Sequence, residues 1–341
     1  MHRFVLLPLV LCAAPLLSAQ SYEVTHTYTV GGDGGWDYVT TDPPNHRLFI
    51  GRQNRVMVVD MNDGHLIAEV TGINGAHGVA LAPGTGRGFA TSGDDGSVVM
   101  FDLETYKTLA RIPAGDDADA IIYDPSSSRV ISFNGDAKTA TVIDPKKGTR
   151  IANIALGGKP EAGQSARNGK IYVNLVDSSQ IVEIDAKTLS ATRRWSTLSC
   201  KNPVSMAIDT RRQRLFSGCR SGVLAVSDYR NGKVITTVPI GRGVDGAGYD
   251  PIRRDVYASN GEGTLTVIHQ DSPDSYRVVE NVQTAQGGRT MALDPASHRI
   301  YIASSKFGAV PAESTATNPR RRPPVIPGSF FVIVVEPVAS H

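Results

Sequence analysis

A pattern of about 42 residues repeats along this chain and constrains its fold more than any other feature. In each copy a short apolar strand leads into a turn, often Asp-Pro, and then into a second strand of alternating residues. The seven copies start at residues 36, 77, 119, 161, 204, 244 and 289. A third strand recurs with the same period. It ends at Asp60, Asp102, Asp144, Asp185, Asp228 and His269, so its spacing by subtraction is 41 to 43 residues.

A repeat of this length with four short strands is typical of a β-propeller, in which each unit forms one blade and buries its faces against its neighbours. Fourth strands fit at 66–70, 108–112, 150–154 and 234–238. The sequence therefore predicts an all-β fold, a seven-bladed β-propeller with four-stranded blades. The last unit lacks a fourth strand of its own, and the segment 22–30 can supply it. That pairing would close the ring and remove the exposed edges.

We expect a single propeller domain over residues 20–341, interrupted by an insertion in its last unit. Residues 305–328 are rich in Pro and Arg and lie between the second and third strands of that unit. This composition favours a surface loop with polyproline II character. Two readings stay open for the loop, an irregular connector and a lid or partner-binding segment.

Residues 1–19 have the pattern of a secretory signal peptide. A basic start at Arg3 precedes an apolar run from Phe4 to Leu17, and Ser18 and Ala19 provide a cleavage site. Lipid attachment at Cys12 is disfavoured because the preceding Leu11 is too large for the usual lipoprotein cleavage site. No other stretch reaches the ~20 apolar residues that a membrane-spanning helix needs. We therefore expect a monomeric bacterial protein that is periplasmic or secreted.

The other two cysteines, Cys200 and Cys219, flank one predicted hairpin. Oxidising compartments favour disulfides, so export predicts a Cys200–Cys219 bond. Two buried free thiols are the alternative.

Several blade segments carry a family resemblance, namely "NPVSMAIDTRRQRLFSGCRSG", "PIGRGVDGAGYDP", "SNGEGTLTVI" and "GGRTMALDPASHRIYIAS". With these in register, the chain resembles the YncE or YVTN-repeat family of exported bacterial seven-bladed propellers. The tetrapeptide itself occurs only loosely, as "YVNL" and "YASN". The resemblance implies the fold, but such proteins are usually named by the repeat rather than by a reaction. Single-stranded nucleic acid binding is attributed to some similar propellers, yet 6% aromatic residues and a net charge of +2 argue against it.

Polar residues recur where the first strand of each unit begins. In a propeller these positions converge on one mouth of the central channel, so we expect them to form one ligand-binding ring. The ring residues are Asp37, His77, Asp119, Glu161, Asp245 and Arg289, with Val204 at the seventh position. The carboxylates would repel one another unless a cation, or Arg289 and His77 of the ring itself, offsets their charge. A divalent cation such as calcium is the candidate cofactor, with Asp37, Glu161 and Asp245 as its ligands. Hydrogen bonds to neighbouring loop backbones are the structural alternative.

The functional expectation is an exported binding protein that takes a small polar ligand or a protein partner at the channel mouth. The sequence holds no nucleophile elbow and no haem-attachment motif, so no reaction is assigned. The alternative is a metal-dependent hydrolase of lactonase type, in which Asp119 or His77 would move protons beside the metal.

Overall fold

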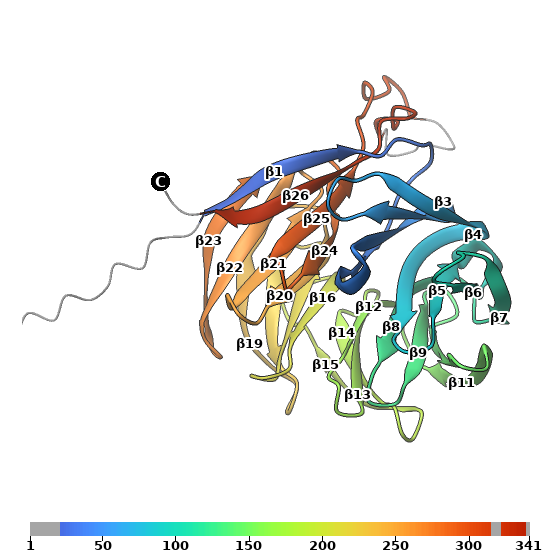
Figure 1. The fold of residues 1–341 in the computed structure, drawn as a ribbon. Coiled ribbons are helices and arrows are strands. Elements are labelled where there is room, and N and C mark those ends of the chain that lie inside the picture. The colour runs from blue at the N-terminus through green and yellow to red at the C-terminus, as the bar shows by residue number, and fades with distance from the viewer. Residues whose placement is uncertain (1–20, 315–321, 339–341) are drawn as a thin grey trace, which may run out of the picture.

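The computed structural model describes residues 21–314 and 322–338, and within these ranges the chain is an all-β propeller (Figure 1). The predicted signal peptide and residues 315–321 of the predicted insertion lie outside the described residues. Short 3-10 turns at η1 (Pro43–Asn45) and η2 (Gly93–Asp95) are the helical elements of the described chain. Within the same ranges no helix is long and apolar enough to cross a membrane.

The described strands pair antiparallel in six sheets, and four of these sheets each hold four strands that follow one another in the chain. The first contains β8 (Ala118–Asp124), β9 (Arg129–Asn134), β10 (Thr139–Asp144) and β11 (Thr149–Ala155). The second contains β12 (Pro160–Ser165), β13 (Lys170–Leu175), β14 (Gln180–Asp185) and β15 (Ser190–Ser196). The third contains β16 (Pro203–Asp209), β17 (Arg214–Cys219), β18 (Val223–Asp228) and β19 (Lys233–Pro239). The fourth contains β20 (Val244–Asp250), β21 (Asp255–Asn260), β22 (Thr264–Ser272) and β23 (Ser275–Gln283).

The other two sheets have a different make-up. One has six strands, β2 (Val39–Asp42), β3 (Arg47–Asp60), β4 (Leu66–Ala82), β5 (Arg87–Ser92), β6 (Ser97–Asp102) and β7 (Thr108–Pro113). The last joins both ends of the described chain, because β1 (Ser21–Thr29) pairs with β26 (Phe331–Val338), which is followed by β25 (Arg299–Ser304) and β24 (Thr290–Asp294). Figure 1 shows β1 lying along β26 at one side of the propeller.

The innermost strands enclose the channel. Contacts run from β2 to β4 and then through β8, β12, β16, β20 and β24, which contacts β2 again. The apolar core lies between adjacent sheets. One buried cluster joins Phe133 of β9 to Val173 of β13, and another joins Phe216 of β17 to Val256 of β21. Each sheet therefore buries its faces against the sheets beside it, as the repeat predicts.

Most aspartates of the repeat hold turns rather than face the channel. Asp209 accepts hydrogen bonds from the backbone N–H groups of Arg211 and Arg212, each at 3.0 Å, in the turn after β16. Asp185 does the same at the end of β14, where the N–H groups of Lys187 and Thr188 lie 2.8 Å away. A carboxylate that accepts such bonds stabilises the turn locally. These acids recur because each blade needs the same turn.

Candidate functional site

The structure brings the predicted ring residues to one end of the channel. Asp37 lies two residues before β2, and Arg289 directly precedes β24. The other four polar residues lie in strands, His77 in β4, Asp119 in β8, Glu161 in β12 and Asp245 in β20. All four carboxylates act on the hydroxyl of one residue, Tyr38, whose pKa is raised well above 10 by burial and then by the charges of Asp119, Glu161, Asp37 and Asp245. The acids of the ring therefore converge on Tyr38.

His77 lies between two of these acids. Its Nδ1 is 2.6 Å from Oδ2 of Asp37 and 3.5 Å from Oδ1 of Asp119. Burial disfavours the imidazolium, but the hydrogen bond to Asp37 and the charges of both acids raise the pKa of His77 to about 9. His77 is therefore a resident cation at neutral pH. Burial, followed by repulsion from Asp37 and Glu161, also raises the pKa of Asp119 well above its usual value.

Asp245 has a cation of its own. Arg289 donates a hydrogen bond from Nε to Oδ2 of Asp245 at 2.8 Å. Burial raises the pKa of Asp245 to about 6 even though the guanidinium of Arg289 opposes that shift. The ring thus contains two separate ion-paired groups, one around His77 and one around Arg289.

Glu161 belongs to neither group. Of its ring neighbours, Val204 carries no charge and Asp119 repels it, and no hydrogen bond or ion pair of the Glu161 side chain occurs within the described residues. Burial and then repulsion from Asp245 raise the pKa of Glu161 to about 7, with Arg220 as the leading opposing charge. Glu161 is half-buried, ionisable near neutral pH and open to an external partner.

A pocket of about 430 Å³ lies beside Glu161 at this mouth. It is lined by Asp117, Asp119, Lys159, Glu161, Val176, Asp177, Asn202 and Arg220. The ammonium group of Lys159 already has two acidic partners, because its Nζ lies 2.8 Å from both Oδ2 of Asp117 and Oδ1 of Asp136. The sequence pattern identified only Asp119 and Glu161 here. Lys159 lies two residues before a ring position. Arg220 lies in a turn, and its position does not follow the ring pattern of the repeat.

Tyr38 is a further residue that sequence reasoning missed. It follows Asp37, and the residues at the equivalent place in the other six strands are all small: Gly78, Ala120, Ala162, Ser205, Gly246 and Thr290. Tyr38 packs against an apolar cluster that includes Ala120 and Ile122 of β8. The small residues thus leave room for this one large ring. A comparison across the repeats would have exposed the contrast.

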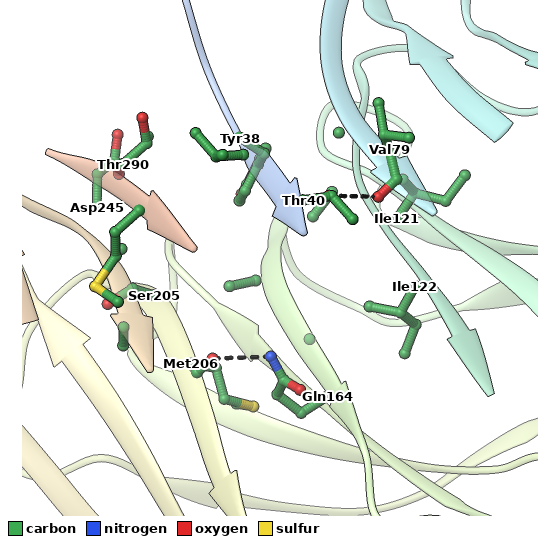
Figure 2. A pocket seen from close by; sticks show the side chains of 18 residues that line it. Tyr38, Thr40, Val79, Ile121, Ile122, Gln164, Ser205, Met206, Asp245 and Thr290 are labelled. Atoms are coloured by element: carbon green, nitrogen blue, oxygen red, sulfur yellow. Dashed lines mark hydrogen bonds between the residues drawn. The ribbon is translucent and has the colours of Figure 1, made fainter. Parts of the chain in front are cut away.

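A second pocket, of about 150 Å³, lies in the channel at Tyr38 (Figure 2). Apolar side chains such as Ile122 and Met206 supply much of its wall. Gln164 donates from Nε2 to the carbonyl of Met206 at 3.0 Å, and so ties β12 to β16 across the wall. This pocket is therefore a narrow and mainly apolar space, unlike the charged pocket at the mouth.

The geometry favours a different metal-ligand group from the trio expected from the sequence. Among the described residues, the ligand atoms of Asp37, His77 and Asp119 lie within 4.8 Å of one another, and so do those of the group Asp60, Asp63 and His65. Glu161 and Asp245 belong to neither group, and Arg289 already pairs with Asp245. A site with an imidazole ligand suits zinc or a similar transition metal better than calcium, which prefers oxygen ligands. His77 would have to lose its Nδ1 proton before it could coordinate.

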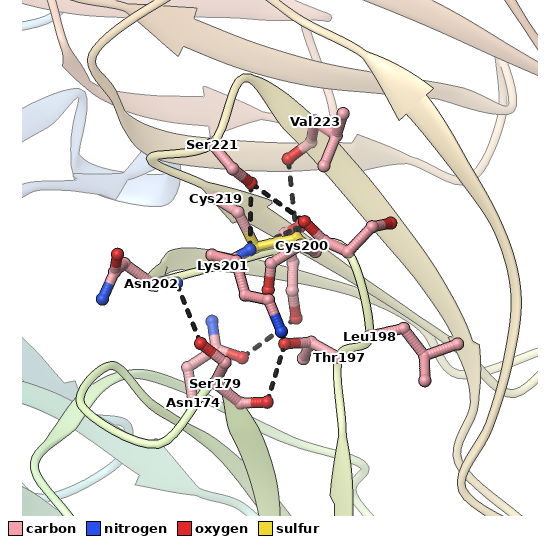
Figure 3. The surroundings of a disulfide bond; sticks show 12 residues. Asn174, Ser179, Thr197, Leu198, Cys200, Lys201, Asn202, Cys219, Ser221 and Val223 are labelled. Atoms are coloured by element: carbon pink, nitrogen blue, oxygen red, sulfur yellow. Dashed lines mark hydrogen bonds between the residues drawn. A yellow bond between two sulfur atoms is a disulfide. The ribbon is translucent and has the colours of Figure 1, made fainter.

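A disulfide borders the mouth. Cys200 and Cys219 are bonded, with their Cα atoms 5.4 Å apart, and both are fully buried (Figure 3). The backbone N–H of Arg220 donates to the carbonyl of Asn202 at 3.1 Å. The disulfide and this hydrogen bond therefore both join the loop that carries Asn202 to the turn that carries Arg220.

Comparisons with known proteins agree with this architecture. No family model matches the chain. The chain is 24% identical over 169 residues to the uncharacterized protein YncE of Salmonella typhi, and the match covers 47% of each protein. The chain thus spans about half the length of this curated relative. Together with the propeller fold, this weak homology is consistent with the YncE-like propeller family.

A solved structure supports the fold alone. The Kuenenia stuttgartiensis hydrazine synthase superimposes with a TM-score of 0.70 at 17% identity, covering 82% of this chain and 94% of that chain. Identity this low carries no functional information, because one fold hosts many functions.

Proposed function

We propose that this protein is an exported binding protein that holds a small polar ligand at the charged mouth of its channel. One observation carries the proposal: Glu161, a half-buried carboxylate, lines a pocket of about 430 Å³ without an ionic partner in the described chain. A buried ionisable group without a partner is costly, and a ligand can supply the missing charge. The ion-paired residues around Glu161 form the rest of the charged pocket wall.

A ligand screen tests this function. Thermal unfolding of the mature protein is followed with amino acids, sugar acids, polyamines and divalent cations, and hits are measured by calorimetry. We expect at least one class to raise the unfolding temperature and to lose affinity in both Glu161→Gln and Asp245→Asn. Asp271→Asn is the matched control, because this exposed acid lies at the outer end of β22. Binding that survives both mouth substitutions would refute the proposal, as would a screen in which no class binds.

A metal-dependent hydrolase is a second candidate, and the group Asp37, His77 and Asp119 favours it. In this reading the three residues would hold a divalent ion, which would supply Lewis-acid activation of a carbonyl and of water. Elemental analysis of protein purified without chelators or a metal-affinity tag tests the idea. A stoichiometric ion that is lost in Asp119→Asn and kept in Asp245→Asn would support this group and justify assays on lactones. Loss in Asp245→Asn alone would favour the trio Asp37, Glu161 and Asp245. A metal-free protein would refute the hydrolase.

We also infer that the propeller has seven blades. β3 and β4 contain 14 and 17 residues, about twice the length of most inner strands, and each has a register shift near its middle. Positive φ angles at Gln53 in β3 and at Gly72 and Gly75 in β4 coincide with these points. Both strands can therefore be divided at a turn, which makes two blades of the six-stranded sheet. The pairing of β1 with β26 supports ring closure by the N-terminal strand. An experimental structure tests both inferences.

Export is part of the same proposal. The disulfide supports an oxidising compartment, because such bonds rarely persist in the cytosol. We propose that residues 1–19 direct export and that the mature protein is a periplasmic or secreted monomer. N-terminal sequencing of the protein from a periplasmic extract tests the cleavage site, and light scattering tests the oligomeric state.

A further inference from the structure

The mouth pocket contains two charged side chains of opposite sign that form no hydrogen bond or ion pair with the described part of the chain. Asp117 pairs with Lys159, Asp119 with His77, and Asp177 with Lys138. Of the charged residues that line the pocket, Glu161 and Arg220 remain, and neither side chain forms a hydrogen bond or an ion pair within the described ranges. They face the same space without forming a salt bridge to each other.

The charge pattern favours a ligand that carries both signs over a ligand of a single sign. A purely anionic ligand would be repelled by the four carboxylates that line the pocket, namely Asp117, Asp119, Glu161 and Asp177. A purely cationic ligand would leave the exposed guanidinium of Arg220 without a partner and would be repelled by it. A ligand with one positive and one negative group satisfies both free side chains at once. Arginine suits the negative end because its planar guanidinium binds carboxylates through two parallel hydrogen bonds.

The position of Arg220 is fixed by covalent and hydrogen bonds around its turn. Cys219, which precedes it, is bonded to Cys200, and the N–H of Arg220 donates to Asn202. Asn202 in turn donates from Nδ2 to the carbonyl of Val176 at 3.0 Å, so the turn is tied to the end of β13. Glu161 lies in β12, next to β13 in the same sheet. The backbones that carry the two free charges are therefore held by rigid elements, which lowers the entropic cost of binding.

We infer that the mouth pocket binds a free α-amino acid as its zwitterion, with the ammonium group at Glu161 and the carboxylate at Arg220. This assignment rests on the proposed function, since it names the ligand class of the same site. Val176 is the apolar residue of the lining and offers a small surface for the side chain of the ligand. The pocket volume of about 430 Å³ has room for a single amino acid together with water.

Matched ligands test the inference on the wild-type protein. Each standard L-amino acid is first screened by thermal shift, and calorimetry then compares L-alanine with propionate and ethylamine, which lack the ammonium and carboxylate groups respectively. We expect at least one amino acid to bind, and each single-charge analogue to bind at least about tenfold more weakly than L-alanine. Equal binding of either analogue, or no binding by any amino acid, would overturn the inference.

Two variants locate the site. Glu161→Gln and Arg220→Gln keep the approximate size of each side chain, and each should weaken amino acid binding at least about tenfold. Glu104→Gln and Arg211→Gln, at exposed positions outside the pocket, are the matched controls and should bind normally. Circular dichroism and the unfolding temperature confirm that each variant is folded. Unchanged affinity in both mouth variants would place any amino acid elsewhere and refute the site.

The same screen separates this inference from the broader function. If a sugar acid, polyamine or divalent cation binds with dependence on Glu161 and Asp245 while amino acids do not, the mouth is a binding site and the zwitterion assignment is wrong. If no class binds, both proposals fail.

Discussion

Arg289 and Asp245 occupy equivalent positions at the start of neighbouring inner strands, and they form a hydrogen bond of 2.8 Å between Nε and Oδ2. His77 and Asp37 are another such neighbouring pair, at 2.6 Å. The polar ring therefore neutralises much of its own charge by pairing between adjacent strands. Glu161 is the exception because its neighbour is Val204, and this gap in the pairing is what makes the pocket beside it a binding site in our proposal.

Glu161 should make the protein less stable as the pH rises. A carboxyl group whose pKa is higher in the folded than in the unfolded protein stabilises the fold below its unfolded pKa, and the contribution is lost as pH rises through the folded pKa. For Glu161 the unfolded pKa is 4.5 and the folded pKa is about 7. We expect Glu161→Gln to be more stable than the wild type at about pH 8 and similar to it at about pH 4. Urea unfolding across this range measures the difference.

The control for this pH effect is Glu104→Gln, which changes an exposed carboxylate in the turn after β6. Its difference from the wild type should stay within about 0.5 kcal/mol at every pH. If Glu161→Gln shows the same flat profile, burial and repulsion do not act on Glu161 as described.

Removal of the His77 cation should destabilise the mouth. In His77→Gln the carboxylates of Asp37 and Asp119 lose the charge between them, and we expect the free energy of unfolding at neutral pH to fall by about 1–3 kcal/mol. His65→Gln is the matched control. Its pair with Asp63 has side chains that are 60% and 67% exposed, so the change should be below about 1 kcal/mol. Equal effects of the two substitutions on urea unfolding would contradict a structural role for the ion pair at His77.

Arg52 should be essential for the segment between β1 and β2. Its side chain is fully buried, its Nε donates to the carbonyl of Gly35 at 3.0 Å, and its guanidinium lies 3.7 Å from the ring centre of Phe330. Burial lowers the pKa of Arg52 to about 10. Arg52→Met removes the buried donor that holds the carbonyl groups of this segment together, so we expect a loss of about 3 kcal/mol or more in urea unfolding. A loss below about 0.5 kcal/mol, the range expected for the exposed control Arg211→Met, would contradict this role.

The sequence was sufficient to predict an all-β propeller because this architecture is periodic. The propeller fold is confirmed, and β14, the third strand of its blade, ends at Asp185 as the repeat indicated. The register placed Asp37, His77 and Asp245 at equivalent positions of their repeats, and the structure brings them to one mouth. Periodicity was informative here because equivalent residues in a ring of repeats must meet around one axis.

The details of the site depend on side-chain contacts that do not recur from one repeat to the next. Register alone does not say that His77 pairs with Asp37 or that Arg289 pairs with Asp245, because both depend on side-chain conformations. Arg220 reaches the mouth from a turn whose place is fixed by tertiary contacts rather than by the repeat. Two members of the expected metal trio, Asp37 and Asp245, lie in such pairs, with His77 and Arg289 respectively.

The disulfide should contribute stability by restricting the unfolded chain. Cys200 and Cys219 are 19 residues apart, and in the chain-entropy model a loop of this size contributes about 3 kcal/mol. The double variant Cys200→Ala, Cys219→Ala should lose roughly that amount in urea unfolding, and the wild type should approach the variant when a reducing agent is added. The same variant should also weaken ligand binding at the mouth, because Arg220 directly follows Cys219 and would be held less firmly. A variant with unchanged stability would show that the hydrogen bonds of this loop suffice, and the disulfide would then have no structural role in placing Arg220.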